Sequence, residues 1–159
     1  MKAIIIYTSR YGCTEKAAYL LKNQLGEETE VVNLMLAKEP TLERYDTVIL
    51  GGSIYYGKIQ KQMTEFALKY QSELGKKHVG LFICAGAKVE QATQELKSAF
   101  PEKLYNESIT KEVFGDEIYE EKITVLDRLV LRMVRGKNRS ANGLSKEAIE
   151  RFALAIKKR

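Results

Sequence analysis

The sequence is poor in the residues that build metal centres, disulfide frameworks and thiol active sites. It holds two cysteines, Cys13 and Cys84, and one histidine, His78. Two cysteines and a lone histidine match no zinc-ligand spacing and support no Cys/His nucleophile. We therefore expect no metal site.

Long apolar runs and processing signals are also lacking. No stretch approaches the roughly 20 apolar residues of a membrane-spanning helix. The N-terminal MKAIIIYTSR has too short an apolar region, and no small-residue cleavage site, for a signal peptide. There is no internal repeat, low-complexity tract or linker, and 159 residues suit one domain. We expect a single domain over residues 1–159, located in the cytoplasm.

Acidic residues become scarce towards the C-terminus. Residues 1–121 contain 15 Lys and Arg against 18 Asp and Glu, whereas residues 122–159 contain 11 against 3. A basic end indicates an anionic partner, whether lipid, nucleic acid or acidic small molecule, or else only a solvated face.

What the sequence does contain is an alternation of short apolar runs with segments of helical periodicity. The runs predict five strands, and the periodic segments predict helices over 16–25, 60–70 and 89–100 and from Ser145 onward. Such an alternation predicts an α/β fold, a parallel sheet with helices on both faces whose ligands bind at the carboxyl ends of the strands. The predicted strands are 3–6, 30–34, 46–52, 78–84 and 108–114.

The loop after the first strand, within YTSRYGCTE at residues 7–15, is rich in hydroxyl groups around a glycine. It leads into a helix, where unpaired backbone N–H groups and the positive end of the helix dipole favour an anion. Arg10 adds a positive charge. We interpret this loop as a phosphate site; the alternative is an ordinary strand-to-helix turn with polar caps.

The loop after the third strand carries the paired aromatic residues Tyr55 and Tyr56. A phosphate site beside a pair of aromatic rings suits a ligand with a phosphate at one end and a flat ring system at the other, and FMN fits that description. Glycines at 51, 52, 57 and 86 would let the backbone approach the ring. The alternative for the tyrosines is hydrophobic packing over the sheet end.

Other phosphate-binding motifs fit less well. The sequence has no GxxxxGK[ST] for a nucleoside triphosphate and no GxGxxG for a dinucleotide. A tyrosine phosphatase would need a cysteine before the arginine, and here Arg10 precedes Cys13.

The pattern YTSRYGCTE resembles the phosphate loop of flavodoxins. Three stretches are similar, more narrowly, to the flavodoxin-type, menaquinone-dependent protoporphyrinogen dehydrogenases: the arginine-containing loop 9–14, the loop 53–57, and the pair Asp127-Arg128 that opens an apolar, basic segment. The resemblance implies a flavodoxin-like, doubly wound sheet of strand order 2-1-3-4-5. It also implies FMN as the cofactor.

Carried over by position, the resemblance gives a set of cofactor-binding residues. Cys13 would offer a backbone amide where flavodoxins often have asparagine. The chain departs from flavodoxins in two ways: it has no aromatic residue in the loop after the fourth strand, and its pI is about 9.1 where they are usually acidic. Both departures favour an enzyme over an electron carrier. The implied residues are Thr8, Ser9, Arg10, Tyr11, Gly12, Cys13 and Thr14 around the phosphate, and Ser53, Ile54, Tyr55, Tyr56, Gly57, Ala85, Gly86 and Ala87 around the ring.

The basic segment 123–135 shows helical spacing. On a helix its three arginines fall within about 80 degrees of one another, and apolar side chains cover most of the rest. It is either a buried helix with solvated arginines or an interfacial helix that meets membrane, quinone or an anionic substrate. By similarity, the carboxylates of a porphyrinogen would pair with Arg128, Arg132, Arg135, Lys137 or Arg139.

Three functions are therefore open. The first is an FMN-dependent oxidoreductase of the protoporphyrinogen dehydrogenase type, passing electrons from a porphyrinogen through FMN to a quinone. Glu117 and Tyr119 could assist it, but no catalytic residue is assigned. The second is a small electron-transfer flavodoxin serving protein redox partners, and the third is a flavin-free binding module with a basic tail. No nucleic-acid partner is expected.

Overall fold

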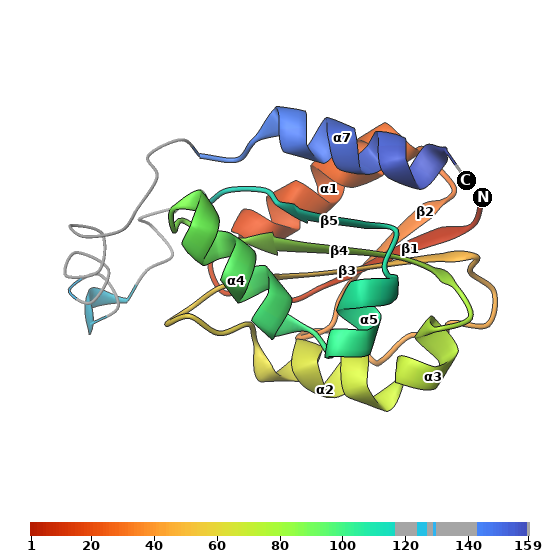
Figure 1. The fold of residues 1–159 in the computed structure, drawn as a ribbon, viewed down its shortest axis with the longest axis horizontal. Coiled ribbons are helices and arrows are strands. Elements are labelled where there is room, and N and C mark those ends of the chain that lie inside the picture. Colours follow the sequence, from red (N-terminus) through yellow and green to blue (C-terminus); the bar gives the residue numbers. More distant parts are fainter. Residues whose placement is uncertain (117–123, 127–128, 130–142, 159) are drawn as a thin grey trace.

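A five-stranded parallel sheet forms the middle layer of the molecule, in a computed structural model that describes residues 1–116, 124–126, 129 and 143–158 (Figure 1). The spatial order is β2-β1-β3-β4-β5, and every neighbouring pair of strands is parallel. The predicted α/β fold and strand order are both confirmed. The strands are β1 (Ala3–Tyr7), β2 (Thr29–Asn33), β3 (Thr47–Ser53), β4 (His78–Cys84) and β5 (Thr110–Val113).

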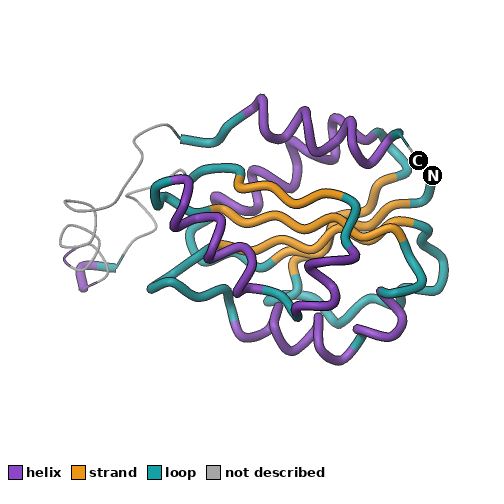
Figure 2. The backbone as a smooth tube through the Cα atoms, in the orientation of Figure 1, coloured by secondary structure: helices purple, strands orange, loops and turns teal. Residues whose placement is uncertain are grey.

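Helices cover both faces of this sheet (Figure 2). On one face lie α1 (Cys13–Leu25) and α7 (Lys146–Lys157). The other face is covered by α2 (Lys61–Lys69), α3 (Gln71–Leu74), α4 (Val89–Ala99) and α5 (Glu102–Glu107). The two shortest helices, α3 and α5, were not predicted. The helix predicted over 89–100 does end before Pro101, and this proline is also the N-cap of α5, because its fixed φ is compatible with a helix start.

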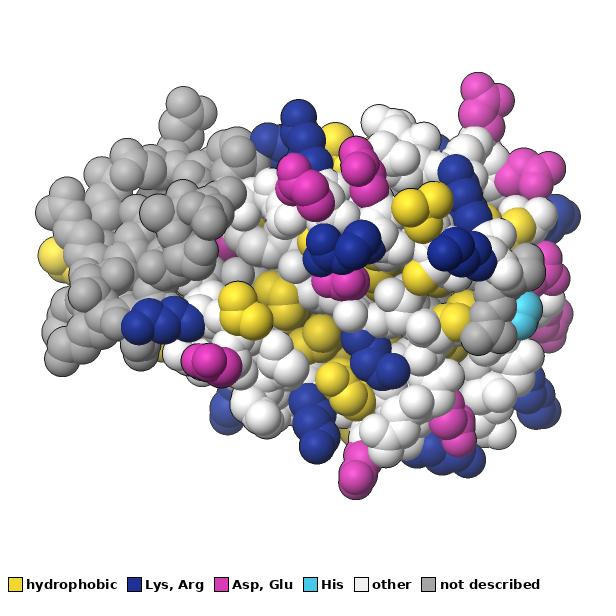
Figure 3. Space-filling model, turned by 45° about the horizontal axis from the view of Figure 1, so that its top comes forward, with side chains coloured by type: hydrophobic (Ala, Val, Ile, Leu, Met, Phe, Trp, Pro, Cys, Tyr) yellow, Lys and Arg dark blue, Asp and Glu magenta, His cyan; other side chains and the backbone are white. Residues whose placement is uncertain are grey.

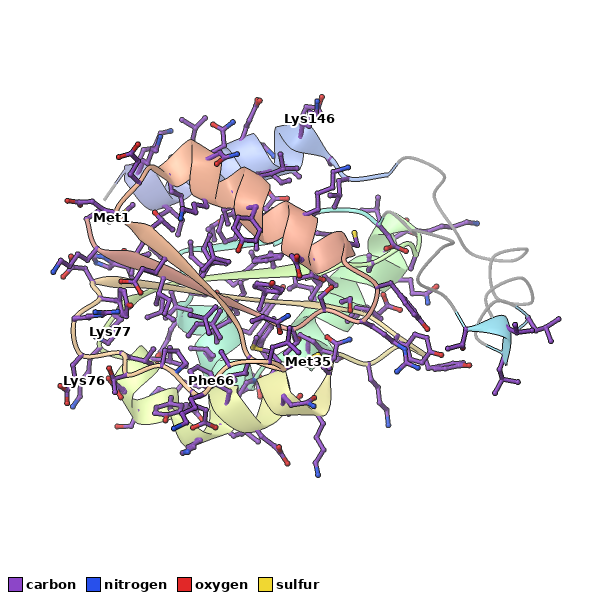
Figure 4. All side chains as sticks on the ribbon, turned by 180° about the vertical axis from the view of Figure 1, so that it is seen from behind. Met1, Met35, Phe66, Lys76, Lys77 and Lys146 are labelled. Carbon is purple, nitrogen blue, oxygen red and sulfur yellow. The ribbon has the colours of Figure 1, made fainter. Side chains whose placement is uncertain are left out.

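Each face of the sheet has its own hydrophobic core, as expected for strands buried on both sides. All five residues of β1 are buried. Below the sheet, Phe66 of α2 is 1% exposed and is directed towards the strands (Figure 4). Above it, the rings of Phe82 and Phe114 stack with centroids 4.6 Å apart, and Phe152 of α7 packs against both edge-on.

Two of the glycines expected to let a ligand approach are instead required by this packing. A Cβ at Gly51 would overlap the ring of Phe82. A Cβ at Gly52 would lie 2.5 Å from Cγ1 of Ile59 and 2.8 Å from Oγ1 of Thr8. Packing therefore requires glycine at these two positions, and the approach of their backbone to a ring stays a prediction.

The five basic residues assigned to substrate or membrane, as well as Glu117 and Tyr119, lie outside the described residues. Within the described part of the chain, we find no helix with the length and apolar character that crossing a bilayer requires. The prediction that residues 1–159 form a single domain stays a prediction.

Candidate functional site

The loops that follow the central strands are joined to one another at the carboxyl edge of the sheet. The parallel ladder continues past the strand ends: the N–H of Thr8 donates to the carbonyl of Gly51 at 3.0 Å, and that of Ile54 to the carbonyl of Cys84 at 2.9 Å. The N–H of Ala85 donates in turn to the carbonyl of Gly115, also at 2.9 Å. The sheet therefore brings the loops after β1, β3, β4 and β5 together.

The loop after β1 ends in a left-handed turn that starts α1. Gly12 is the N-cap with φ 93°, a conformation that glycine adopts without steric cost. Its N–H donates to Oγ of Ser9 at 3.0 Å, which curls the loop back on itself. No side chain caps the N-terminus of α1. The positive end of this helix is thus presented to the loop, as an anion site requires.

The first turn of α1 contains a buried hydroxyl. Oγ1 of Thr14 is inaccessible to solvent and has no hydrogen-bond partner among the described residues. An orphaned buried hydroxyl is uncommon, since its desolvation costs about 1–3 kcal/mol. A phosphate oxygen held by this loop is one group that would satisfy it.

Both cysteines lie beneath this turn. Burial raises the pKa of the Cys84 thiol, and its interaction with the Cys13 thiol raises that pKa further. The Cys84 thiol also lies near Thr14, but outside hydrogen-bonding geometry. Both thiols are buried, which identifies them as packing groups under the loop rather than nucleophiles.

The base of the loop is tied to α1 by a tyrosine. The hydroxyl of Tyr7, the last residue of β1, donates to Oε2 of Glu15 at 3.0 Å. Burial, together with this carboxylate, raises the pKa of Tyr7 well above its usual value. The tyrosine therefore stays protonated and keeps the first turn of α1 attached to the end of β1.

Sequence reasoning missed a residue that joins the first two loops. The side-chain oxygen of Gln60 accepts from Oγ1 of Thr8 at 2.8 Å and from the N–H of Ser53 at 3.2 Å, and its nitrogen donates to Oγ of Ser53 at 2.8 Å. No motif marks this glutamine in the sequence. Only its place before α2, at the end of the aromatic loop, could have pointed to it.

Arg10 and the tyrosines form a cluster across the same two loops. The guanidinium carbon of Arg10 lies 3.8 Å from the ring centroid of Tyr55 and 5.5 Å from that of Tyr11. Tyr55 in turn meets Tyr56 edge-on, with centroids 4.3 Å apart. The phosphate-site candidate and the aromatic loop are therefore in direct contact.

The aromatic loop turns tightly between Tyr55 and Lys58, which exchange backbone hydrogen bonds of 2.9 and 3.1 Å. The two residues at its tip, Tyr56 and Gly57, both have positive φ, 50° and 74°. Positive φ is costly for a tyrosine, and such strain is concentrated at functional sites. Tyr56 is 60% exposed at the tip of the turn.

The third loop, Ala85 to Ala87, contributes only small side chains. It borders a pocket of about 520 Å³ that extends over the end of β5. Within the described residues, no group of three or more His, Cys, Asp and Glu side chains could hold a metal ion.

The structure thus places the sequence-predicted cofactor residues of all three loops at one edge of the sheet. Whether they bind FMN stays a prediction. The residues so placed are Thr8, Ser9, Arg10, Tyr11, Gly12, Cys13, Thr14, Ser53, Ile54, Tyr55, Tyr56, Gly57, Ala85, Gly86 and Ala87.

A parallel sheet of order 2-1-3-4-5, with a glycine-turned loop at the first helix and aromatic residues after the third strand, defines the flavodoxin-like class of α/β proteins. The chain belongs to the flavodoxin family, because the Flavodoxin domain family matches residues 4–145. Proteins of this family typically bind FMN.

Among curated proteins, the chain is similar to the protoporphyrinogen IX dehydrogenase [quinone] of Escherichia coli K12. The two are 38% identical over 77 residues, which are 46% of this chain and 42% of the enzyme. The enzyme of E. coli O157:H7 matches to the same extent. The match therefore spans less than half the length of these relatives.

Solved structures of the class superpose on nearly the whole chain. A WrbA-like flavodoxin from Agrobacterium tumefaciens has a TM-score of 0.60 at 16% identity, over 99% of this chain and 98% of its own. The flavodoxin of Streptococcus pneumoniae TIGR4 gives 0.58 at 14% identity, over 98% and 97%. At this identity the likeness shows the fold alone.

Proposed function

We propose that this protein is an FMN-dependent oxidoreductase of the protoporphyrinogen dehydrogenase type, which takes electrons from a porphyrinogen and passes them to a quinone. The observation that carries the proposal is the contact of Arg10 with Tyr55. It links a helix N-terminus suited to a phosphate with an aromatic loop suited to a flat ring. The partial similarity to the E. coli enzyme supports the choice of reaction.

Bound FMN would supply the redox chemistry, by accepting hydride equivalents and passing electrons on. The chain supplies position and charge. The N–H groups of the first turn of α1 and the charge of Arg10 would hold the phosphate, and the hydroxyl of Thr14 would complete its hydrogen bonds. Tyr55 would pack against the ring, and Gln60 holds the two loops at a fixed separation.

The basic C-terminal segment would meet the substrate or the membrane. Arg128, Arg132, Arg135, Lys137 and Arg139 suit the carboxylates of a porphyrinogen or an anionic lipid surface. Three described residues of the same segment, Val125, Leu126 and Leu129, are 76%, 73% and 55% exposed, which suits an apolar environment. The proposal places the protein in the cytoplasm, at the membrane surface.

An absorption spectrum and an activity assay test the proposal. Purified protein should be yellow, with bands at about 370 and 450 nm that are typical of a bound oxidised flavin. The FMN-loaded protein should then oxidise protoporphyrinogen faster than buffer alone when menaquinone is present. Oxidation at the rate of buffer alone, under conditions where the E. coli enzyme is active, would refute the proposed reaction. A colourless protein that fails to take up added FMN would support the flavin-free binding module instead.

An electron-transfer flavodoxin is the second candidate, favoured by the exposed side chain of Tyr56 at the tip of the aromatic loop. A carrier would deliver electrons to protein partners through that edge. Reductive titration separates the two functions. Two resolved one-electron steps indicate the carrier, and a single two-electron step indicates the enzyme.

A further inference from the structure

An apolar recess lies beside the candidate flavin site and borders the loop Ala85 to Ala87. It has a volume of about 520 Å³ and opens between α4 and the turn that leads into α7, above the end of β5. Its volume is in the range of small-molecule sites. Figure 3 shows hydrophobic side chains gathered on this face and bordered by basic and acidic ones. The apolar lining is Ala85, Ala87, Val89, Ala92, Leu96, Val113 and Leu144.

This recess shares a wall with the predicted ring site. Ala85 and Ala87 line the recess and also belong to the loop assigned to the flavin ring. No aromatic side chain of that loop stands between the two sites, since its residues are Ala85, Gly86, Ala87 and Lys88. Only the small residues of this loop therefore separate a ring bound against it from the recess.

The backbone around the recess is well fixed. The N–H of Ser145 donates to the carbonyl of Phe114 at 2.8 Å, and that of Asp116 to the carbonyl of Gly143 at 3.3 Å. The mouth, in contrast, exposes an apolar side chain, because Val89 at the start of α4 is 81% exposed. The wall of the recess is therefore largely preformed, as the walls of small-molecule sites usually are.

The charges at the rim decide which ligand the recess suits. Two cations, Lys111 and Arg151, face three carboxylates, those of Glu112, Asp116 and Glu147. Arg151 is already paired with Glu112 at 3.3 Å, and Nζ of Lys111 donates to the carbonyl of Ser108 at 3.1 Å. Among the described residues, the rim thus offers no excess of positive charge, which favours an uncharged ligand over one that carries carboxylates.

We propose that this recess binds the electron acceptor, an uncharged planar quinone, against the loop of Ala85 and Ala87. The inference rests on the proposed function, since it assigns a site to that reaction's acceptor. The quinone takes up two electrons and two protons from the reduced cofactor and leaves as the hydroquinone. Binding at this place puts the two rings on either side of the small residues Ala85 and Ala87.

Binding to the flavin-free chain tests the site without any turnover. Menadione, a naphthoquinone without a long isoprenoid tail, is titrated into isotope-labelled apoprotein and followed by amide NMR. Shifts that saturate and are confined to the lining, including Val89, Thr93, Val113 and Leu144, are the expected result. Unchanged spectra, or shifts elsewhere, would overturn the inference.

Two matched variants of α4 then distinguish menadione binding in the recess from binding elsewhere on the surface. Thr93 lines the recess and Gln94 does not, although both are exposed on the same helix. Thr93→Trp should weaken menadione binding about tenfold or more by filling the space, whereas Gln94→Trp should leave it unchanged within about twofold. Equal effects of the two variants would contradict the assignment.

The same variants tell the two proposals apart. In FMN-loaded protein, Thr93→Trp should raise the menadione concentration that gives half-maximal reoxidation of the reduced flavin, with FMN binding unaffected. A chain that binds menadione in the recess but takes up no FMN would sink the proposed function and leave the recess as a quinone site. A chain that binds FMN but leaves menadione unbound would sink only the inference.

Discussion

The guanidinium carbon of Arg10 lies 3.8 Å from the centre of the Tyr55 ring, so that a cation on the phosphate-site loop rests on an aromatic residue of the loop after β3. A cation stacked on a ring holds both groups, and the arrangement fixes the distance between the two predicted ends of the ligand site. Substitutions of Arg10 can therefore separate the contribution of its charge to FMN affinity from the contribution of its flat shape.

We predict that Arg10→Ala lowers FMN affinity about 10- to 100-fold, because both the charge near the phosphate and the support of Tyr55 are lost. The FMN affinity of Arg10→Lys should lie between those of Arg10→Ala and the parent chain, because lysine keeps the charge but not the planar stacking surface. Titration of apoprotein with FMN measures the effect. Equal affinities for Arg10→Lys and the parent chain would show that stacking is unimportant.

The two ends of α1 provide a matched pair of glycines. Gly12 and Gly26 both have positive φ, 93° and 110°, so alanine at either position should cost about 1 kcal/mol or more of folding free energy. Only Gly12→Ala should also weaken FMN binding, because only Gly12 shapes the phosphate-site loop. Thermal unfolding and FMN titration separate the two effects. Weaker FMN binding in both variants would mean that overall stability, and not the loop, determines affinity.

Gln60 connects two loops through hydrogen bonds that are partly buried. Gln60→Ala leaves the buried hydroxyl of Thr8 without its acceptor, and we expect a loss of about 1–3 kcal/mol in the free energy of unfolding. Gln62→Ala, on the exposed side of α2, is the control and should change little. Urea unfolding measures both. A cost shared by the two variants would indicate a helix effect and not a lost connection.

Glu95 on α4 has a buried carboxylate oxygen without a hydrogen-bond partner among the described residues. Burial raises the pKa of this carboxyl, although a hydrogen bond from Gln91 opposes the shift. The folded state thus binds this proton more tightly than the unfolded state, and the stability that the group contributes falls as the pH rises from the unfolded pKa through the folded one. At neutral pH its charge is destabilising.

Glu95→Gln should therefore raise the melting temperature at pH 7, by the equivalent of less than about 1 kcal/mol after solvent screening. The gain should vanish at about pH 3, where the carboxyl is almost fully protonated in both states, since an unperturbed glutamate has a pKa of about 4.3. Glu43→Gln, on an exposed site, is the control for a general charge effect. A gain that is equal at both pH values would contradict the assignment to Glu95.

The sequence predicted the sheet well because its strands are short, apolar and separated by strong helix patterns. Ile4, Ile5 and Ile6 have only one stable location, the centre of a sheet covered on both faces. The stop at Pro101 was predicted correctly, since α4 ends at Ala99, but the same proline also starts α5, which the sequence pattern did not indicate. The packing role of Gly51 was not predictable, because only the packed structure shows that the Phe82 ring fills the space of a missing Cβ.

The candidate site was predictable where the residue types alone indicate the chemistry, as in the loop that contains the hydroxyl of Ser9 and the glycine Gly12. It was not predictable where function depends on a distance. Gln60 is one ordinary glutamine in the sequence, and its role arises from the fold, which places Thr8 and Ser53 within its reach. The contact between Arg10 and Tyr55 has the same origin, since 45 positions separate the two in the chain.

Two backbone hydrogen bonds, from Thr8 to Gly51 and from Ile54 to Cys84, extend the sheet beneath the candidate site. The floor of the site is main chain and belongs to the sheet, whereas its rim consists of side chains that contribute little to the core. Substitutions at the rim can therefore accumulate without threatening the fold. A lineage that keeps this floor is free to change the groups that its rim contacts.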